Sequence, residues 1–338
     1  MARLIQNWEN RIGRRLKLRD LHILSAVVQW GSMAKGAVYL GMSQPAVSEA
    51  IASLEDALRV RLLDRSPQGV EPTIYARALL KRGNVVFDEL KQGIRDIEFL
   101  ADPTAGEIHI GCPESLAAGF VPSVVERLTS RYPKISVHVM AAQPGEQEFR
   151  ELRDRSVDLL LGRVFKPLSS DDVAADLLCQ DAFFVVAGAR SQWARRRKVA
   201  LEELIDEPWI FFPLNSVVNS YIEEGFRANG LELPRQSVTS FSMQMRLHLL
   251  ETGRFLTVLH DSVLRFNAKR WLLKALPIDL RIRPIPIAIF TLKNRTLGPV
   301  VQLFVEHARE VAKSIFGGPV RRPVHRREPE RPPIEHTR

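Results

Sequence analysis

Apolar residues recur every three or four positions through the first part of the chain, in three segments at residues 21–28, 33–40 and 44–58. This spacing is that of one face of an α-helix. Glycines follow the first two segments, and Ser43 precedes the third as an N-cap. Pro45 is tolerated in the first turn of a helix, where its missing N–H would bond nothing. The pattern therefore predicts three short helices in succession.

Residues 73–100 show the pattern of one long helix, with charged residues between the apolar ones. The helix is expected to stop before Pro103, because proline disfavours a helical conformation in the residue that precedes it. A lone helix with an apolar stripe must bury that stripe against something, and a second copy of the chain is the expected partner. The stripe consists of Ile74, Leu79, Val86, Leu90, Ile94, Ile97 and Leu100.

From residue 107 to about residue 316, short apolar strands alternate with amphipathic helices. This order indicates βαβ units with mostly parallel sheets, in two subdomains with a cleft between them. Residues 161–163 mark the expected crossover to the second subdomain. The first half is predicted to hold strands 107–111, 135–140 and 157–161 and helices 120–132 and 146–155. The second half is predicted to hold strands 182–187, 209–212, 237–241, 255–259 and 285–292 and helices 218–229 and 298–316.

The composition is that of a globular protein, since 45% of the 338 residues are hydrophobic and 26% are charged. This length suits about two domains. No apolar run approaches the ~20 residues that a membrane helix needs, and residues 1–15 lack the apolar core of a signal peptide. The two cysteines, Cys112 and Cys179, cannot form a disulfide framework and are expected to be small buried hydrophobes. A reducing cytoplasm, without contact to a membrane, is the expected compartment.

The net charge of +9 favours a polyanionic partner such as nucleic acid. Most of the excess lies at the ends: residues 1–16 hold four arginines against Glu9, and residues 317–338 hold six arginines against three glutamates. Residues 17–65 are almost balanced. The last segment carries five prolines and no apolar pattern, so a disordered tail is expected there. The basic ends are expected to add only salt-sensitive, non-specific affinity.

The third helix has the features of a DNA-reading element, because its face opposite the apolar stripe holds small and polar residues beside the helix N-terminus. Small residues permit close approach to the major groove, and Gln and Ser side chains bond base edges or phosphates. Residues 59–73 follow as a turn-rich hairpin, or wing, flanked by arginines suited to phosphates. The alternative is a generic three-helix bundle with a solvated polar face.

One set of residues in this region carries a family resemblance: Gly31-Ser32-Met33, Ala37, Leu40, Ser43-Gln44-Pro45-Ala46-Val47-Ser48, Ile51, Leu54-Glu55, Leu58, Arg61-Leu62 and Asp64-Arg65. The set resembles the winged helix-turn-helix of LysR-type transcriptional regulators, and the rest of the chain to about residue 316 follows that family's order and lengths. The resemblance implies an α/β fold with an N-terminal all-α winged helix-turn-helix. A long linker helix and a two-lobed effector domain, built like a periplasmic binding protein, complete the expected architecture.

The resemblance implies a sequence-specific DNA-binding transcriptional regulator, not an enzyme, with no cofactor or metal. Its expected partners are double-stranded DNA with an interrupted palindrome, a small-molecule effector, RNA polymerase, and further copies of the chain in a homodimer or homotetramer. The expected domains are a basic leader (1–16), a DNA-binding domain (17–73), a linker and dimerisation helix with its hinge (74–106), an effector domain (107–316) and a tail (317–338). The residues expected to contact DNA are Ser32, Ser43, Gln44, Pro45, Ala46, Ser48, Glu49, Ser53 and Arg65.

The chain departs from the family pattern at several positions. Ala34 and Gly36 stand where the family usually has Thr and Ala, so the second helix is expected to lose a cap oxygen that Ser32 replaces. Arg59 and Leu63 stand in place of Gly and Phe. Arg59 adds a candidate phosphate contact but is expected to strain its turn. None of these changes removes the reading helix.

The effector is expected beyond the carboxyl ends of the strands, between the two lobes. Backbone N–H groups at the helix start after the first strand can hold a carboxylate or another polar group. Arg163 is expected to pair either with an anionic effector or with a neighbouring aspartate. The polar loop residues are alternatively ordinary caps and turns. The expected effector contacts are Ser115, Gly145, Gln147, Arg163 and Ser216.

The alternative function is a ligand-binding protein or enzyme of the two-lobed α/β type without DNA regulation. An enzyme has little support, because the sequence shows no G-x-S-x-G, G-x-G-x-x-G, P-loop or H-E-x-x-H pattern. The eight histidines are scattered along the chain, and no spacing of His, Cys and Asp indicates a metal site.

Overall fold

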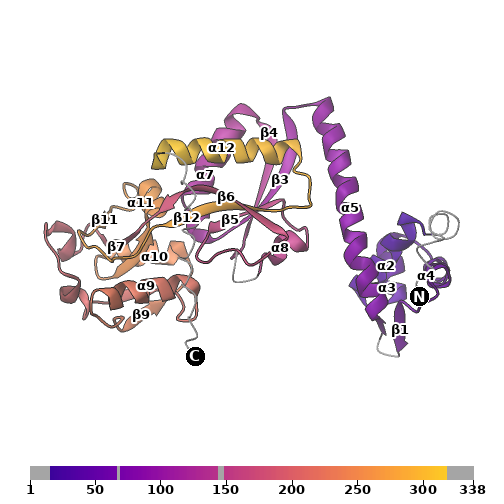
Figure 1. Cartoon of the computed structure of the whole chain (residues 1–338), viewed down its shortest axis with the longest axis horizontal. Coiled ribbons are helices and arrows are strands. Elements are labelled where there is room, and N and C mark those ends of the chain that lie inside the picture. The colour runs from indigo at the N-terminus through magenta and orange to yellow at the C-terminus, as the bar shows by residue number, and fades with distance from the viewer. Residues whose placement is uncertain (1–15, 67–68, 144–147, 318–338) are drawn as a thin grey trace, which may run out of the picture. The chain divides into compact units, whose positions relative to one another are not determined.

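The computed structural model describes residues 16–66, 69–143 and 148–317. The chain divides into two compact units, Met1–Ile94 and Arg95–Arg338 (Figure 1). Apart from Leu16 and Gly317, the expected leader and tail lie outside the described residues. No described helix is long and apolar enough to cross a membrane.

The first unit opens with the helices α2 (Leu18–Trp30), α3 (Met33–Leu40) and α4 (Gln44–Leu58), which confirm the three predicted helices. Each turns its apolar face to a shared core. At Gly36, a Cβ atom would lie 3.1 Å from Val27 Cγ2, so α3 packs closely on α2 at this position. The core residues without exposed surface include Leu24, Val27, Val47, Ile51 and Leu54.

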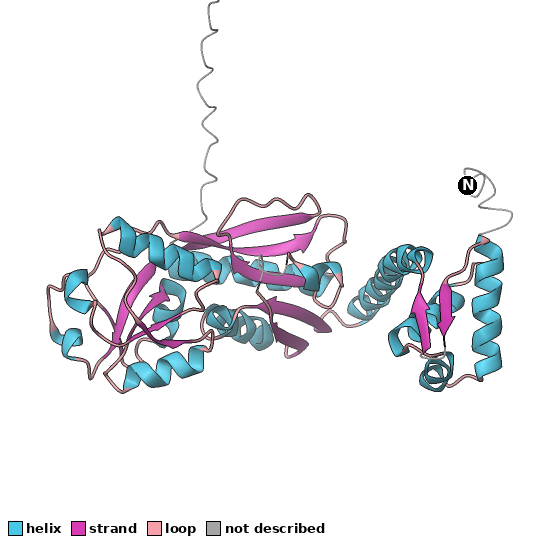
Figure 2. Ribbon diagram, turned by 90° about the horizontal axis from the view of Figure 1, so that it is seen from below, coloured by secondary structure: helices cyan, strands magenta, loops and turns pink. Residues whose placement is uncertain are grey.

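The strands β1 (Leu63–Ser66) and β2 (Gly69–Pro72) pair antiparallel as the predicted wing, and Figure 2 shows them beside the helices. The Val70 N–H donates to the Gly31 carbonyl at 2.9 Å, which fixes the wing on the turn between α2 and α3. At Gly69, φ is +140° and a Cβ would lie 2.6 Å from the same carbonyl oxygen. This position therefore requires glycine.

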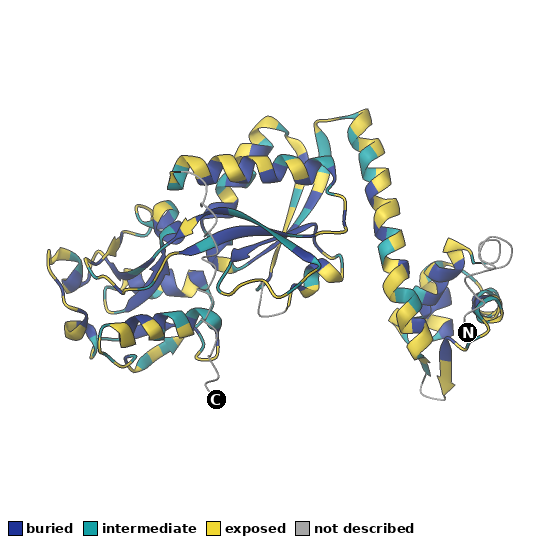
Figure 3. Ribbon diagram, viewed as in Figure 1, coloured by how far each residue is buried: buried dark blue, intermediate teal, exposed yellow. Residues whose placement is uncertain are grey.

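The predicted long helix is α5 (Ile74–Ala101). Thr73 begins it: the hydroxyl accepts the Ala76 N–H at 3.3 Å and donates to the Arg61 carbonyl at 2.8 Å. Leu79 packs against the core formed by α2 to α4, whereas the rest of the predicted stripe is exposed (Figure 3). The exposed members are Ile74, Val86, Leu90, Ile94, Ile97 and Leu100.

The first lobe of the second unit is built on a five-stranded sheet in the order β4-β3-β5-β12-β6. Strand β3 pairs parallel with β4 and β5, whereas β12 pairs antiparallel with β5 and β6. The helices α7 and α12 cover one face of the sheet (Figure 1). The bounds are β3 (Ala105–Cys112), β4 (Lys134–Ala141), β5 (Leu159–Arg163), β6 (Val173–Asp181), β12 (Ile285–Leu292), α6 (Glu114–Ala117), α7 (Phe120–Arg131), α8 (Arg150–Arg153) and α12 (Pro299–Phe316).

The second lobe is built on another five-stranded sheet, in the order β11-β7-β10-β8-β9. Its core is aromatic: the Trp209 and Phe211 rings stack with centroids 5.2 Å apart, and Phe226 meets both edge-on. The strands are β7 (Phe183–Gly188), β8 (Trp209–Phe211), β9 (Gln236–Thr239), β10 (Leu256–His260) and β11 (Leu273–Ala275). The helices are α9 (Val217–Ala228), α10 (Met243–Glu251) and α11 (Asp261–Asn267), with 3-10 turns η3 (Gln192–Arg195) and η4 (Leu201–Leu204).

Five details of the predicted effector half are wrong. The helix expected at 298–316 in the second half is α12, which packs in the core of the first lobe. Both sheets contain antiparallel pairs as well as parallel ones. The strand expected at 285–292 in the second half is β12 of the first sheet, and the chain crosses to the second lobe after β6, not at residues 161–163. The helix expected at 146–155 is only the four residues of α8 within the described part. An apolar pattern specifies which face is buried but not which strand lies alongside.

Both cysteines are free and buried in the core of the first lobe, as expected. Burial raises the pKa of the Cys112 thiol to about 11, and that of Cys179 to about 12, with a smaller contribution from the nearby Asp181 charge. Both thiols therefore stay protonated at neutral pH and act as core side chains.

Candidate DNA-reading helix and effector cleft

The start of α4 is fixed by its own side chains. The Ser43 Oγ accepts the Ala46 N–H at 3.4 Å, and Pro45 occupies the first turn. Val47 and Ile51 are fully buried one turn apart, so they hold one face of the helix against the core. The opposite face is thereby turned to solvent.

The residues expected to read DNA gather on that solvent face. Gln44 and Ser48 lie four positions apart, as do Pro45 and Glu49, so the two pairs form neighbouring rows. Ser43, Gln44, Pro45, Glu49 and Ser53 are exposed, and Ala46 and Ser48 are partly exposed. The geometry leaves these side chains accessible to a major groove.

Two expected DNA contacts lie outside α4. Ser32 is the N-cap of α3, where its Oγ accepts the Lys35 N–H at 3.5 Å. Its hydroxyl therefore supplies the cap oxygen that α3 was expected to lose, because residue 34 is Ala where the family usually has Thr. Arg65 is exposed on β1, opposite Val70 of the wing.

The sequence analysis gave Glu55 no role, although the structure gives it a defined position. Its Oε1 accepts the N–H groups of Leu62 at 2.7 Å and Leu63 at 3.2 Å. These bonds join the last turns of α4 to the start of the wing. Glu55 therefore orients the wing relative to the reading helix, and its place in the family motif was the only signal for it.

Arg163 is the centre of a buried network at the junction of the two lobes. Its guanidinium pairs with the Asp181 carboxylate at 2.9 Å. Further N–H groups donate to the hydroxyls of Ser115 at 2.9 Å and Ser262 at 3.0 Å. Asp181 also accepts the backbone N–H and the hydroxyl of Ser262, each at 2.8 Å. Ser115 follows a first-lobe strand and Ser262 begins a second-lobe helix, so the network ties the lobes together.

A small cleft of about 30 Å³ between the lobes adjoins this network. Ser115, Gly162 and Arg163 line it from the first lobe, and Val218 and His260 line it from the second. Three phenylalanines that the sequence analysis did not select supply its apolar surface: Phe165, Phe212 and Phe241. Phe165 and Phe212 follow the apolar strands β5 and β8, and all three resemble core residues in sequence, so the pattern gave no sign that they face a cleft.

The Phe212 ring, which forms one wall of the cleft, packs on the buried guanidinium of Arg246. Arg246 is fully buried and lies under the Phe212 ring, with its guanidinium carbon 3.8 Å from the ring centroid. It donates to the carbonyls of Ser240 and Ile210 and to the Thr257 hydroxyl. Burial lowers the pKa of Arg246 to about 9, so it remains charged at neutral pH. The contact fixes the orientation of Phe212.

His260 is the buried polar group of the second-lobe wall. Its ring lies 4.5 Å from the Phe183 ring, and its Nε2 has no hydrogen-bond partner among the described residues. Burial lowers the pKa of His260 well below the ordinary 6.5, and the charges of Arg163 and Arg246 add to this effect. The imidazole is therefore neutral and lies buried in the second-lobe wall.

The remaining expected effector contacts lie elsewhere. Ser216 is buried as the N-cap of α9, where its Oγ accepts the Asn219 N–H at 3.3 Å. It does not line the cleft, although Val218 two residues later does. Gly145 and Gln147 lie outside the described residues.

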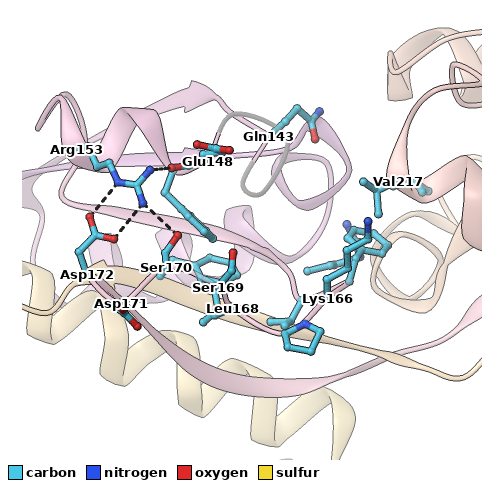
Figure 4. Close-up of a pocket in the computed structure, with 17 residues that line it drawn as sticks. Gln143, Glu148, Arg153, Lys166, Leu168, Ser169, Ser170, Asp171, Asp172 and Val217 are labelled. Atoms are coloured by element: carbon cyan, nitrogen blue, oxygen red, sulfur yellow. Dashed lines mark hydrogen bonds and ion pairs between the residues drawn. The ribbon is translucent and has the colours of Figure 1, made fainter.

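A second pocket, of about 780 Å³, continues from the same junction (Figure 4). It shares Arg163, Phe165 and Val218 with the interlobe cleft. At its far end, Arg153 pairs with Asp172 at 2.9 Å and donates to the Ser170 hydroxyl at 3.1 Å. The space for a ligand therefore extends from the lobe junction along residues 164–172.

Known proteins resemble the chain along most of its length. The chain is 27% identical over 290 residues to the HTH-type transcriptional regulator GbpR of Azospirillum brasilense, covering 84% of this chain and 83% of that protein. It is 25% identical over 295 residues to the HTH-type transcriptional regulator TdcA of Escherichia coli K12, covering 87% and 93%.

Among solved structures, the LysR family transcriptional regulator CbnR superposes with a TM-score of 0.60 at 22% identity, covering 88% of this chain and 100% of that chain. Full-length CbnR in complex with its target DNA gives a TM-score of 0.61. At this identity the similarity establishes a common fold.

Two family descriptions match the chain. "Bacterial regulatory helix-turn-helix protein, lysR family" matches residues 18–77, which hold α2 to α4 and the wing. "LysR substrate binding domain" matches residues 101–313, which hold both lobes and the cleft. The chain therefore belongs to the LysR family, as a DNA-binding transcriptional regulator with an effector-binding domain.

Proposed function

We propose that two copies of the chain bind an interrupted palindrome in double-stranded DNA through the exposed face of α4, in the cytoplasm, and that a small molecule in the interlobe cleft modulates transcription. The observation that carries the proposal is the solvent face of α4, which presents Gln44 and Ser48 from a capped helix start. Side chains of this kind at a helix N-terminus reach base edges in the major groove.

The test compares binding to an operator and to random DNA by fluorescence anisotropy at physiological salt. The operator is sought first in the promoter region of the chain's own gene or an adjacent one. Gln44→Ala and Ser48→Ala are each expected to reduce the ratio of specific to random affinity by about fivefold or more, because a good base contact is worth ~1–3 kcal/mol of discrimination.

Gln29→Ala is the matched control, because Gln29 is exposed on α2, outside the reading face. It should leave the ratio unchanged. If both α4 variants keep the ratio of the unaltered protein, α4 is not the reading face. If the unaltered protein binds the candidate operators no tighter than random DNA, sequence-specific regulation of those sites is excluded.

The cleft supports an effector site because both lobes contribute to it. Ser115, Phe165 and Arg163 come from one lobe, and Phe212 and His260 from the other. A molecule held by both sets favours one relative arrangement of the lobes over another. It regulates the protein only if it binds the two arrangements with different affinity.

A thermal-shift screen of small acids and sugars against the full chain tests the effector site. A true effector raises the unfolding temperature, and Phe165→Ala is expected to weaken that response by removing apolar contact area. Met245→Ala is the control, because Met245 is exposed on α10 and does not line the cleft. An identical response in Phe165→Ala and the unaltered chain places the ligand elsewhere.

Dimerisation through α5 is part of the proposal. The exposed residues Val86, Leu90, Ile94 and Ile97 recur every three or four positions along one face of the helix. Pairing of two such faces removes their apolar surface from water. The proposal includes a tetramer formed through the effector domains and a contact with RNA polymerase, tested by sedimentation and by transcription in vitro with purified polymerase.

A further inference from the structure

We infer that Glu107, His109 and His138 form a binding site for a divalent transition-metal ion on the first lobe. One ligand atom from each of these side chains lies within 4.8 Å of the others. The site is separate from the DNA-reading face and is not among the residues that line the interlobe cleft. Its metal class is that of Zn²⁺, Ni²⁺, Co²⁺ and Cu²⁺, which imidazole and carboxylate ligands suit.

The pairing of two parallel strands creates the cluster. His109 on β3 lies directly opposite His138 on β4, and their rings stack with centroids 4.5 Å apart and planes 11° apart. Glu107 lies two residues before His109, so it shares the same face of β3. Ile108 and Ile110 point to the opposite face and are fully buried in the core. The three candidate ligands therefore project from the polar face at the edge of the sheet.

A buried carboxylate already supports one of the two imidazoles. The Asp158 Oδ2 accepts the His109 backbone N–H at 2.8 Å and lies 3.7 Å from the His109 Nδ1. Asp158 is held in turn by a buried ion pair with Arg295 at 2.8 Å. A carboxylate beside one ring nitrogen orients the imidazole and favours the other nitrogen as a metal ligand. The structure thus places an acidic neighbour beside the His109 imidazole.

Glu107 is charged and within reach of a metal. Arg95, on the last turns of α5, bonds the Glu107 Oε1 at 2.6 Å. A carboxylate has a second oxygen that can bind the ion while the first stays with Arg95. Metal binding therefore changes the charge that Arg95 meets at the end of α5.

Coordination requires the two stacked rings, whose planes lie 11° apart, to tilt toward a common ion. Bonds of about 2.0–2.1 Å to a tetrahedral ion place the ligand atoms roughly 3.3 Å apart, closer than in the free cluster. Glu107 and His138 are exposed and His109 is partly exposed, so rotation of these side chains meets little resistance. Three protein ligands leave the fourth position to water.

Isothermal titration of the full-length chain with ZnCl₂, after removal of any affinity tag, tests the site. One Zn²⁺ per chain is expected to bind. His138→Ala and Glu107→Gln are each expected to weaken the binding by about tenfold or more, since loss of a mere supporting partner already costs 10–100-fold.

His248→Ala is the matched control, because His248 is exposed on α10, outside the cluster. The double variant His325→Ala/His336→Ala serves as a second control for histidines near the end of the chain. Both controls should bind Zn²⁺ as the unaltered protein does. Co²⁺ should give a visible absorption band that His138→Ala loses. The inference is overturned if the unaltered chain binds no Zn²⁺, if the cluster variants bind it equally well, or if only a control variant loses it.

Discussion

At the scale of single residues, Arg59 occupies a backbone conformation that suits glycine better. It is the C-cap of α4 with φ of +55° and ψ of +34°. A left-handed conformation costs a residue with a Cβ roughly 1–2 kcal/mol. Arg59→Gly is therefore expected to raise the free energy of unfolding of the DNA-binding unit by about 0.5–1 kcal/mol, because the greater freedom of glycine in the unfolded chain offsets part of the gain.

Urea unfolding followed by circular dichroism measures the effect. Arg61→Gly is the control, because Arg61 is also exposed but is not among the residues with positive φ. This variant should be no more stable than the unaltered chain. If Arg59→Gly also lowers affinity for random DNA at low salt, the Arg59 side chain contributes a phosphate contact in addition to its strain.

His260 gives a pH dependence with a definite sign. Its pKa in the folded protein is lowered below the 6.5 of the unfolded chain, so the unfolded state binds more protons below that pH. The stabilising contribution is fully present above pH 6.5 and is lost as the pH falls through this value. The loss of stability grows as the pH falls further below 6.5.

Thermal unfolding at pH 7.5 and pH 5.5 measures this contribution. His260→Phe keeps the contact with Phe183 and is expected to reduce the drop in unfolding temperature between the two pH values. His248→Phe alters an exposed imidazole and should keep the full drop. An unchanged drop in His260→Phe would mean that other groups cause the pH dependence.

The sequence was informative about residues with local roles. Ser43 and Pro45 were predictable because a helix start depends on its immediate neighbours. For Arg163, the sequence left an effector or an aspartate as the partner, and the structure pairs it with Asp181, 18 residues away. His260 was not selected, because its position beside the cleft depends on how two lobes meet. The reading-face residues remain a prediction until DNA binding is measured.

At the scale of elements, the two strands β6 and β12 show where pattern analysis stops. The helices α2 to α5, α7, α9 and α12 were predicted, since their core face is encoded within one segment, whereas α10 and α11 were not. Strand β12 was predicted as a strand, but its neighbours β5 and β6 come from more than a hundred residues earlier. A hydrophobic pattern carries no information about such pairing. For the same reason the sequence did not reveal the proposed metal-binding site, since His109 and His138 are adjacent only through the pairing of β3 with β4.

Replacement of two glycines by alanine is expected to change the free energy of unfolding in opposite directions. At Gly188, where β7 ends, a Cβ would lie 1.9 Å from the Leu250 carbonyl oxygen of α10. Gly188→Ala is expected to lower the free energy of unfolding by about 3 kcal/mol or more, because backbone must move.

At Gly93 of α5, no atom lies within 4 Å of the added Cβ. Gly93→Ala should therefore stabilise the helix by up to about 1 kcal/mol. Urea unfolding of both variants checks the contrast, and equal effects would contradict it.

At the scale of the whole molecule, the buried Arg163 network connects the two lobes. Its two hydroxyl partners come from helices of different lobes, Ser115 of α6 and Ser262 of α11. Removal of one partner leaves the other charge buried and unpaired, at a cost of about 3–5 kcal/mol. The cleft adjoins the same network, because Ser115 and Arg163 both line it. The network is therefore suited to report occupancy of the cleft to both lobes.

The exposed stripe of α5 leads to the last prediction, which concerns assembly. Leu90 is 48% exposed and Ile94 is 57% exposed, on a helix whose opposite side holds the buried residues Asp88 and Gln92. Leu90→Glu places a charge in the proposed seam, where the like charge of the partner copy repels it. This variant is expected to sediment as a smaller species than the unaltered chain at the same concentration. Because each half of a palindrome then binds separately, its affinity for a full operator should fall toward that for a half-site.

Lys91→Glu is the control for a general effect of added negative charge on assembly. Lys91 is exposed and adjacent to Leu90 in sequence, but its side chain points about 100° around the helix from that of Leu90. It should sediment as the unaltered chain does. Equal sedimentation of all three proteins would exclude Leu90 from the interface. The exposed apolar residues of α5 would then require another partner, since a helix of this pattern is not stable with its stripe in water.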